Sequence, residues 1–288
     1  MFDLIIPIYK IKPIYLEKCL KSISYETQKQ KFEGEYDIYL IDKTPLDWGY
    51  YEECKNIIDS FGEIKYLRQE GVGVSNARNV ASELGNNPYI CFIDGDDYWY
   101  DDHLFEMAEV INTSNQDVVI WWSAMDMIMK SAYEENNYNQ FTINHINTFK
   151  DWHDELHYYY LTRYPICTST VCLRRIRFEE VGGFLEEFAI GEDIEMWCRM
   201  IGYPKQTNQV FKSQQIDVIT GFKHIHEDNT TEGGTQSYVF ETADNSAIFQ
   251  EQLERMVRLV EYPTMEDRPE RISKDIWKDI CERYIKVI

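Results

Sequence analysis

Residues 89–99 read Tyr-Ile-Cys-Phe-Ile-Asp-Gly-Asp-Asp-Tyr-Trp, an apolar run followed at once by acidic side chains. The run over 89–93 predicts a buried β-strand. Asp94, Asp96 and Asp97 would then lie together where the chain leaves this strand, the end at which open α/β sheets bind ligands. Carboxylate oxygens suit Mg²⁺ or Mn²⁺, which keep further positions for phosphate oxygens. The stretch therefore predicts a metal–diphosphate site, with an ordinary acidic turn as the alternative.

Upstream of this stretch, short apolar runs alternate with segments of helical periodicity. Strands are predicted at 3–9, 36–41 and 64–67, helices at 15–24, 50–61 and 77–84, and a glycine-containing loop at 71–76. Strand and helix alternate at the intervals of βαβ units, which predicts an α/β fold with a mostly parallel central sheet and helices on both faces.

Downstream, the periodicity continues but weakens. Helices are predicted at 104–111, 177–181 and 192–200, strands at 117–122, 168–173 and 218–226, an irregular or partly helical insertion at 131–164, and helices at 236–261 and 274–285. We expect one domain over 1–235, with a nucleotide-binding half at 1–112 and an acceptor-binding half at 113–235. Residues 236–288 are expected to form a C-terminal helical extension packed on or beside it.

Composition limits the classes of partner and compartment. The 288 residues are 44% hydrophobic and include 50 acidic against 29 basic side chains, a net charge of -21. This negative charge repels the phosphate backbone of nucleic acids, so nucleic acid is not an expected partner. Seven cysteines without a Cys-x-x-Cys pair favour a reducing compartment. With neither a signal peptide nor a transmembrane segment apparent, we expect a cytoplasmic protein; peripheral membrane attachment stays open.

Four further residues or pairs of residues each have a functional interpretation and a purely structural alternative. Asp42 closes a predicted strand and suits a nucleobase or ribose, or caps a turn. The planar fork of Arg78 suits a diphosphate, or pairs with the 94–97 acids. Asp193, beside Glu192 at a helix start, suits a catalytic base, or caps the helix. His226 suits a metal ligand, or is an ordinary surface histidine.

Taken together, these stretches resemble the inverting family 2 glycosyltransferases of the GT-A fold. Six segments match the family's motifs in family order: Leu4–Tyr9 with 15–23, 42–47, Gly73–Asn79, Phe92–Asp97, Phe178–Phe184 with Glu192, Asp193 and Arg199, and Phe222–Thr231 with His226 at the histidine. The turn at 42–47 departs from the pattern, since Lys43, Thr44 and Pro45 stand where a second acid and a glycine are usual. This departure leaves the nucleobase open, although uridine is the common choice.

The resemblance implies roles for individual residues. Asp193 is the implied catalytic base, and Asp42 the implied contact to the nucleobase. Asp94, Asp96 and His226 are implied around Mn²⁺ or Mg²⁺, with Asp94 also near ribose. The implied donor-binding set is Pro7, Tyr9, Asp42, Arg78, Asp94, Gly95 and Asp96.

The resemblance also implies substrates. The expected donor is a nucleoside-diphosphate sugar, UDP-sugar favoured, and the expected acceptor a hydroxyl, as on a glycan or glycoconjugate. Trp152 or the tyrosines at 158–160 are expected to face an acceptor sugar, with plain packing as the alternative. A sugar-nucleotide nucleotidyltransferase and a non-catalytic sugar-nucleotide-binding protein on the same fold remain rivals. The first is disfavoured because residues 10–13 lack the glycine-rich loop of pyrophosphorylases.

Overall fold

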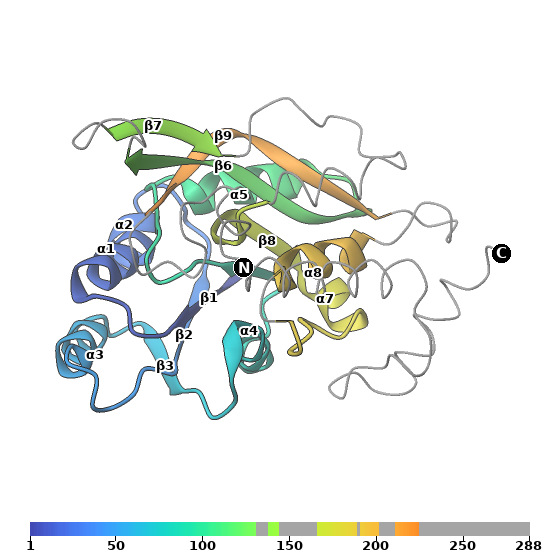
Figure 1. The fold of residues 1–288 in the computed structure, drawn as a ribbon. Coiled ribbons are helices and arrows are strands. Elements are labelled where there is room, and N and C mark those ends of the chain that lie inside the picture. The colour runs from blue at the N-terminus through green and yellow to red at the C-terminus, as the bar shows by residue number, and fades with distance from the viewer. Residues whose placement is uncertain (131–137, 144–165, 189–190, 202–210, 225–288) are drawn as a thin grey trace.

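A computed structural model describes residues 1–130, 138–143, 166–188, 191–201 and 211–224 of the chain. Within these residues a nine-stranded sheet runs in the order β3-β2-β1-β4-β8-β6-β9-β5, with β7 paired to β6 (Figure 1). Helices pack on both of its faces, so the α/β architecture expected from the sequence is present.

The first half of the sheet is built from parallel strands. It consists of β1 (Phe2–Ile8), β2 (Tyr36–Asp42), β3 (Ile64–Arg68) and β4 (Tyr89–Phe92), joined through α1 (Pro13–Ile23), α2 (Tyr25–Gln28), α3 (Tyr51–Ser60) and α4 (Gly73–Leu84). Ile8 pairs with Asp42, and Ile5 with Phe92. The carboxyl ends of β1, β2 and β4 therefore reach the same edge of the sheet.

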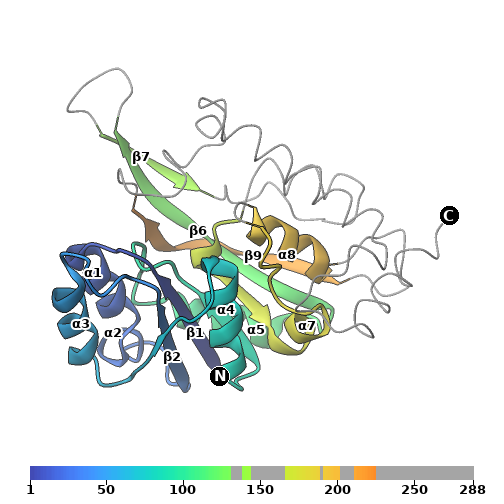
Figure 2. The same ribbon diagram turned by 60° about the horizontal axis from the view of Figure 1, so that its bottom comes forward.

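The second half is mixed in direction. β5 (Tyr98–Trp99), α5 (His103–Thr113) and the long β6 (Val118–Lys130) come first, then β7 (Tyr138–Ile143), the 3₁₀ turn η1 (Thr168–Thr170), β8 (Val171–Arg174), α7 (Arg175–Glu180), α8 (Glu192–Ile201) and β9 (Lys212–Lys223). β8 runs antiparallel to both β4 and β6, whereas β9 runs parallel to β6. β6, β7 and β9 extend together beyond the parallel half (Figures 1 and 2).

Two apolar cores lie on the two faces of the sheet. Successive side chains of a strand point to opposite faces, and β1 divides accordingly: Ile5 joins the core beneath α4, α7 and α8, while Leu4 and Ile6 join the core beneath α1, α3 and α5. Both faces of β1 are buried from Phe2 to Ile6, which explains why residues 4–6 are all apolar instead of alternating; the one charged residue there, Asp3, is buried as well.

The boundary of α4 corrects the sequence prediction. The loop predicted at 71–76 ends early, because the helix begins at Gly73, which has a φ of 85°. The side-chain amide of Gln69 donates to the Gly73 carbonyl and to the Asn76 side chain, both at 2.9 Å. Glycine, serine and asparagine favour loops when considered locally, and this contact outweighs that preference. Arg78 consequently lies in the second turn of the helix, not at its start.

Other boundaries were also wrong, and α2 and β5 were not predicted. The strand predicted at 117–122 is β6, which continues to Lys130. The 131–164 insertion contains a strand, β7, which pairs with β6. The strand predicted at 168–173 opens with η1 and becomes β8 only at Val171. The strand predicted at 218–226 is β9, which begins at Lys212 and ends at Lys223. The errors at β6, β7 and β9 concern pairing with a distant segment, which local periodicity does not record.

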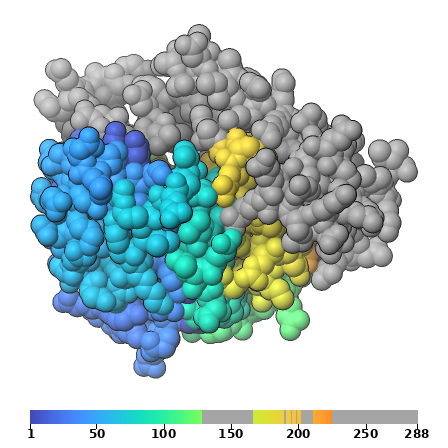
Figure 3. All heavy atoms as spheres, turned by 90° about the horizontal axis from the view of Figure 1, so that it is seen from below, coloured from blue at the N-terminus to red at the C-terminus, as the bar shows by residue number. Residues whose placement is uncertain are grey.

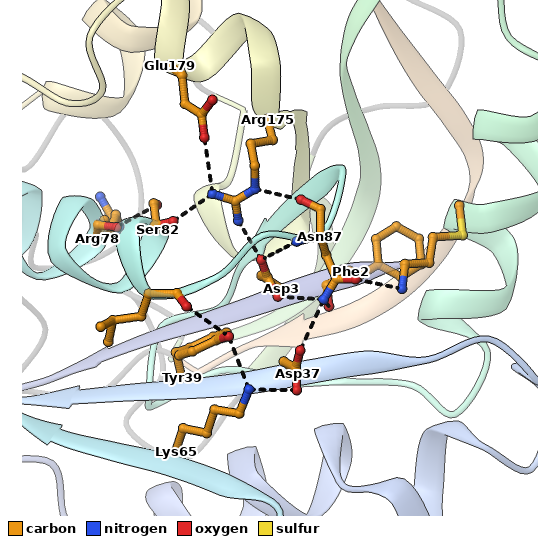
Figure 4. Close-up of polar contacts among 12 residues, drawn as sticks. Phe2, Asp3, Asp37, Tyr39, Lys65, Arg78, Ser82, Asn87, Arg175 and Glu179 are labelled. Atoms are coloured by element: carbon orange, nitrogen blue, oxygen red, sulfur yellow. Dashed lines mark hydrogen bonds and ion pairs between the residues drawn. The ribbon is translucent and has the colours of Figure 1, made fainter.

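A buried ion pair fastens the start of β1 to α4 and α7, at the end opposite the acidic residues 94–97 (Figure 4). Asp3 is fully buried and accepts from the Arg175 guanidinium at 2.5 Å. Arg175 also donates to the carbonyls of Ser82 and Asn87, and the Asn87 backbone N–H donates to Asp3. The tight packing requires a glycine at Gly85, since a Cβ there would lie 2.1 Å from the Asp3 carboxylate.

Arg175→Met should lower the free energy of unfolding by about 3–5 kcal/mol, because it leaves the Asp3 carboxylate buried without its cation. Chemical denaturation measures the loss. Glu179→Gln is the matched control: Glu179 lies 3.6 Å from the same guanidinium but its side chain is 60% exposed, so its removal should cost less than about 1 kcal/mol. An Arg175→Met loss in that lower range would contradict the structural role given to the pair.

In the part of the chain described, no helix is both long enough and apolar enough to span a membrane. Trp152, the tyrosines at 158–160, His226 and the predicted extension at 236–288 lie outside the described residues. The division into halves at residue 112 stays a prediction.

Candidate active site

The acidic segment 94–97 follows β4 directly, as expected from the sequence, but its aspartates differ in environment. Asp97 is 1% exposed. Its Oδ2 accepts from the Ser169 hydroxyl at 2.6 Å, its Oδ1 accepts from the His224 backbone N–H at 2.9 Å, and the Lys223 ammonium lies 3.7 Å away. Burial, with the other two aspartates adding to it and Lys223 opposing, raises the pKa of Asp97 to about 7. Asp97 therefore holds the segment in place.

Gly95 lets the acidic segment approach the end of β1. A Cβ at this position would lie 2.7 Å from Cγ2 of Ile8, a distance that side chains do not adopt. Pro7 stands in β1 opposite Ile41, and Tyr9, just beyond the strand, is 55% exposed. These residues therefore surround the same sheet edge as the half-buried Asp94 and Asp96.

Arg78 connects the acidic segment with the start of α8. Its side chain is 3% exposed; one terminal nitrogen donates to Asp94 at 3.1 Å and the other to Glu192 at 2.8 Å. The pairing with the acids at 94–97 that the sequence left open is thus present for Asp94. Because α4 carries Arg78, this one guanidinium joins three segments that are far apart in the chain.

The two adjacent carboxylates of α8 have different partners. Glu192 is held by Arg78, and burial, followed by repulsion from Asp193, raises the pKa of Glu192 to about 7 although Arg78 opposes both. Asp193 is half-buried, and the Thr168 hydroxyl donates to its Oδ2 at 3.1 Å. Both acids lie in the first helical turn, where the macrodipole favours negative charge.

The position of α8 itself is fixed from its far end. Arg199 forms a bidentate ion pair with Glu195, in which two guanidinium nitrogens donate to the two carboxylate oxygens at 2.7 and 2.6 Å. Arg199 also donates to the carbonyls of Val181 and Gly183. Arg199 and Glu195 are both almost fully buried. The Gly-Gly turn after α7 and the carboxylates at the start of α8 are thereby parts of one packed unit. Seen from below, residues of α4 and of the α7 region lie side by side on the surface (Figure 3).

Asp42 is buried at the end of β2 and is engaged by the protein itself. Its Oδ1 accepts from the Thr44 backbone N–H at 2.7 Å; its Oδ2 accepts from Tyr66 at 2.9 Å and from Arg68 at 2.5 Å. The Lys10 backbone N–H donates to the Thr44 hydroxyl, which ties the loops after β1 and β2 together. A small hollow, with room for about one water molecule, borders Asp42 and Thr44 between β1 and α3.

The sequence interpretation did not identify η1. Thr168 contacts Asp193 and Ser169 contacts Asp97, yet the sequence predicts residues 168–170 to be the first part of the strand at 168–173. The only available signal was the presence of three consecutive hydroxyl side chains next to an apolar run. His224 lies two positions before His226 in the sequence. The centroid of its ring is 4.5 Å from that of the Tyr15 ring.

The sequence and the fold both have recognisable relatives. The family described as "Glycosyl transferase family 2" matches residues 3–178, more than half of the chain. Glycosyltransferase GlyA of Streptococcus pneumoniae serotype 4 is 29% identical over 116 residues, which are 40% of this chain and 16% of that protein. The uncharacterized glycosyltransferase EpsJ of Bacillus subtilis is 28% identical over 120 residues, 41% of this chain and 33% of that protein. The matches thus span at most a third of these relatives.

Solved structures share the fold. TarS residues 1–349 of S. aureus, in complex with UDP-GlcNAc, superposes with a TM-score of 0.61 at 16% identity and covers 99% of this chain and 71% of that one. The mannosyltransferase PcManGT from Pyrobaculum calidifontis, in complex with GDP-Man and Mn²⁺, gives 0.55 at 12% identity, covering 99% and 70%. At these identities the likeness establishes the GT-A fold.

Proposed function

The chain belongs to glycosyltransferase family 2, and from that premise we propose that it transfers a sugar from a nucleoside-diphosphate sugar to an acceptor hydroxyl with inversion. The observation that carries the proposal is the Arg78 bridge. It places Asp94, at the end of β4 where a donor nucleotide is expected, in the same ion-pair network as the start of α8, where Asp193 stands. One side chain, Arg78, therefore links the residue proposed to bind the donor to the helix that carries the residue proposed to act on the acceptor.

In this reaction Asp193 is the proposed base that acts on the acceptor. Its carboxylate takes the proton from the acceptor hydroxyl, and that oxygen attacks the anomeric carbon from the face opposite the nucleotide. No covalent intermediate forms, so one base is sufficient. Glu192 is the poorer candidate because its carboxylate is already bound by the Arg78 guanidinium.

A divalent cation fits the chemistry of the oxygens after β4. Among the described residues, no group of three or more His, Cys, Asp or Glu side chains is arranged to hold a metal ion. Asp94 and Asp96 supply hard carboxylate oxygens, which leaves positions for the oxygens of a diphosphate. We assign the cation to these two residues, with His226 as the further ligand that the family resemblance implies. When bound, Mn²⁺ or Mg²⁺ neutralises charge developing on the leaving diphosphate.

The donor proposed is a UDP-sugar, and the acceptor a glycan or glycoconjugate hydroxyl. The fold accommodates more than one nucleobase, since the similar structures hold UDP-GlcNAc in one case and GDP-Man in another. Asp42 and Thr44 are the proposed surroundings of the base. Pro7, Tyr9 and Gly95 are proposed to complete the donor contacts. Arg78, whose terminal nitrogens bind Asp94 and Glu192, is proposed to hold Asp94 beside the diphosphate instead of binding it directly.

The test is a panel of UDP- and GDP-sugars incubated with Mn²⁺ and simple glycoside acceptors. A glycosyltransferase releases nucleoside diphosphate and forms a glycoside whose anomeric configuration, read by NMR, is inverted relative to the donor. A nucleotidyltransferase would instead turn over only with pyrophosphate or a nucleoside triphosphate, and a binding protein would show thermal stabilisation without turnover. Either of these two results would overturn the proposal.

A further inference from the structure

The turn η1 lies between the two halves of the candidate site. Thr168, Ser169 and Thr170 are all buried, with exposures of 6%, 0% and 0%. The Thr168 hydroxyl donates to Oδ2 of Asp193. The next residue, Ser169, donates to Oδ2 of Asp97 and accepts from the Asp94 backbone N–H at 3.1 Å. Two consecutive residues thus contact the proposed base on one side and the acidic segment on the other.

The turn is held rigidly from all sides. The Ser169 carbonyl accepts from the Trp99 indole N–H at 2.6 Å, and the Thr170 hydroxyl and backbone N–H both donate to the Cys167 carbonyl. The strand that follows the turn, β8, pairs directly with β4, the strand that precedes the acidic segment, with Cys91 opposite Cys172. A buried turn with these bonds satisfied has little freedom to rotate, so its side chains can fix the positions of the groups that they contact.

We propose that Thr168 is a positioning residue for Asp193, an inference that rests on the proposed function. The hydroxyl fixes the rotation of the Asp193 carboxylate, and the peptide bond to Ser169 sets that carboxylate relative to Asp94 and Asp97. The distance between the proton acceptor and the leaving diphosphate is therefore defined through one dipeptide. Such geometry matters for the rate because a 1 Å misplacement costs a factor of roughly 10².

Thr170 supplies the comparison that separates positioning from packing. It is a threonine of the same turn, equally buried, but its hydroxyl donates to a backbone carbonyl at 2.9 Å and contacts no carboxylate of the site in the described structure. Replacing either threonine by valine removes one buried hydroxyl and keeps the shape. Only the change at Thr168 removes a contact to the proposed base.

The experiment measures kcat, the KM for donor and acceptor, and Tm for Thr168→Val, Thr168→Ser and Thr170→Val in the full chain. Thr168→Val should lower kcat by roughly 10–100-fold with the donor KM unchanged. Thr168→Ser should restore most of the rate, since it keeps the hydroxyl. Thr170→Val should keep kcat while losing as much Tm as Thr168→Val. If Thr168→Val does not fold, Thr168→Ala serves in its place.

A double-mutant cycle with Asp193→Asn distinguishes the inference from the function on which it rests. If Thr168 acts through Asp193, Thr168→Val causes no further loss of kcat in the Asp193→Asn background. Additive losses, or a Thr168→Val rate close to wild type while Asp193→Asn is slow, would overturn the positioning role alone. An Asp193→Asn rate close to wild type would instead remove the proposed base.

Discussion

Replacing Asp193 by asparagine should lower kcat for sugar transfer by roughly 10²–10⁴-fold, the usual contribution of a general base. The amide cannot take the acceptor's proton, but it keeps the size of the carboxylate and an oxygen that can accept from the Thr168 hydroxyl. Donor and metal binding should therefore persist, and the fold should survive. The measurement is kcat at saturating donor and acceptor beside the Tm of the same variant, with nucleotide binding followed by calorimetry.

A purely structural role predicts the reverse pattern for Asp193→Asn, with a near-normal kcat and a reduced Tm. Glu180→Gln is a matched control that removes one carboxylate from α7, where Glu180 is 48% exposed and paired with Arg177. This control should keep both kcat and Tm. A rate for Asp193→Asn within a few-fold of wild type would exclude Asp193 from the mechanism and make Glu192 the next carboxylate to test.

Asp96→Asn should weaken nucleotide binding and its dependence on Mn²⁺ together. Removal of a direct metal ligand is expected to cost more than the roughly 10–100-fold in metal affinity that follows loss of an outer partner. The reason is electrostatic, since the site must hold a cation between protein carboxylates and a diphosphate. Titration calorimetry of UDP with and without Mn²⁺ measures the change. With the metal omitted, the variant should bind UDP no more weakly than wild type, because it has one negative charge fewer near the diphosphate.

Asp101→Asn is the control for Asp96→Asn, because it lies five positions away and removes the same charge. Asp101 pairs with Lys31 at 2.9 Å on the surface, and both side chains are about half exposed. Its replacement should leave Mn²⁺-dependent UDP binding as it is in the wild type. Unchanged Mn²⁺-dependent binding in Asp96→Asn itself would show that the metal site is assigned to the wrong residue.

The parallel half of the fold was predictable because its signals are local. Strands β1 to β4 and helices α1 and α3 were placed correctly, within a residue or two, from apolar runs and helical spacing. The start of α4 was wrong, since Gln69 overrides the loop preference of residues 73–76. β7 and the early part of β9 were missed because a strand in this mixed region is defined by the strand that it pairs with.

For the candidate site, the sequence located the candidate acidic residues but not the groups that they contact. The acidic segment 94–97, Asp42 and Asp193 all lie at the ends of elements, as predicted. The sequence did not predict how these carboxylates differ in burial. Asp42 and Asp97 are buried and accept hydrogen bonds from the protein, whereas Asp94 and Asp96 are half-buried. The roles that the resemblance implies for these residues stay predictions until the variants above are measured.

The sequence by itself determined the family, the α/β architecture and the candidate acids, because each depends on residues close together in the chain. Tertiary structure alone decided which groups those acids meet. Ser169 reaches Asp97 across 72 positions, Arg78 reaches Glu192 across 114, and Thr168 reaches Asp193 across 25. Hydrogen bonds of about 3 Å demand a defined position for both partners, and over such separations only the packing of β4, η1 and α8 on one sheet supplies it.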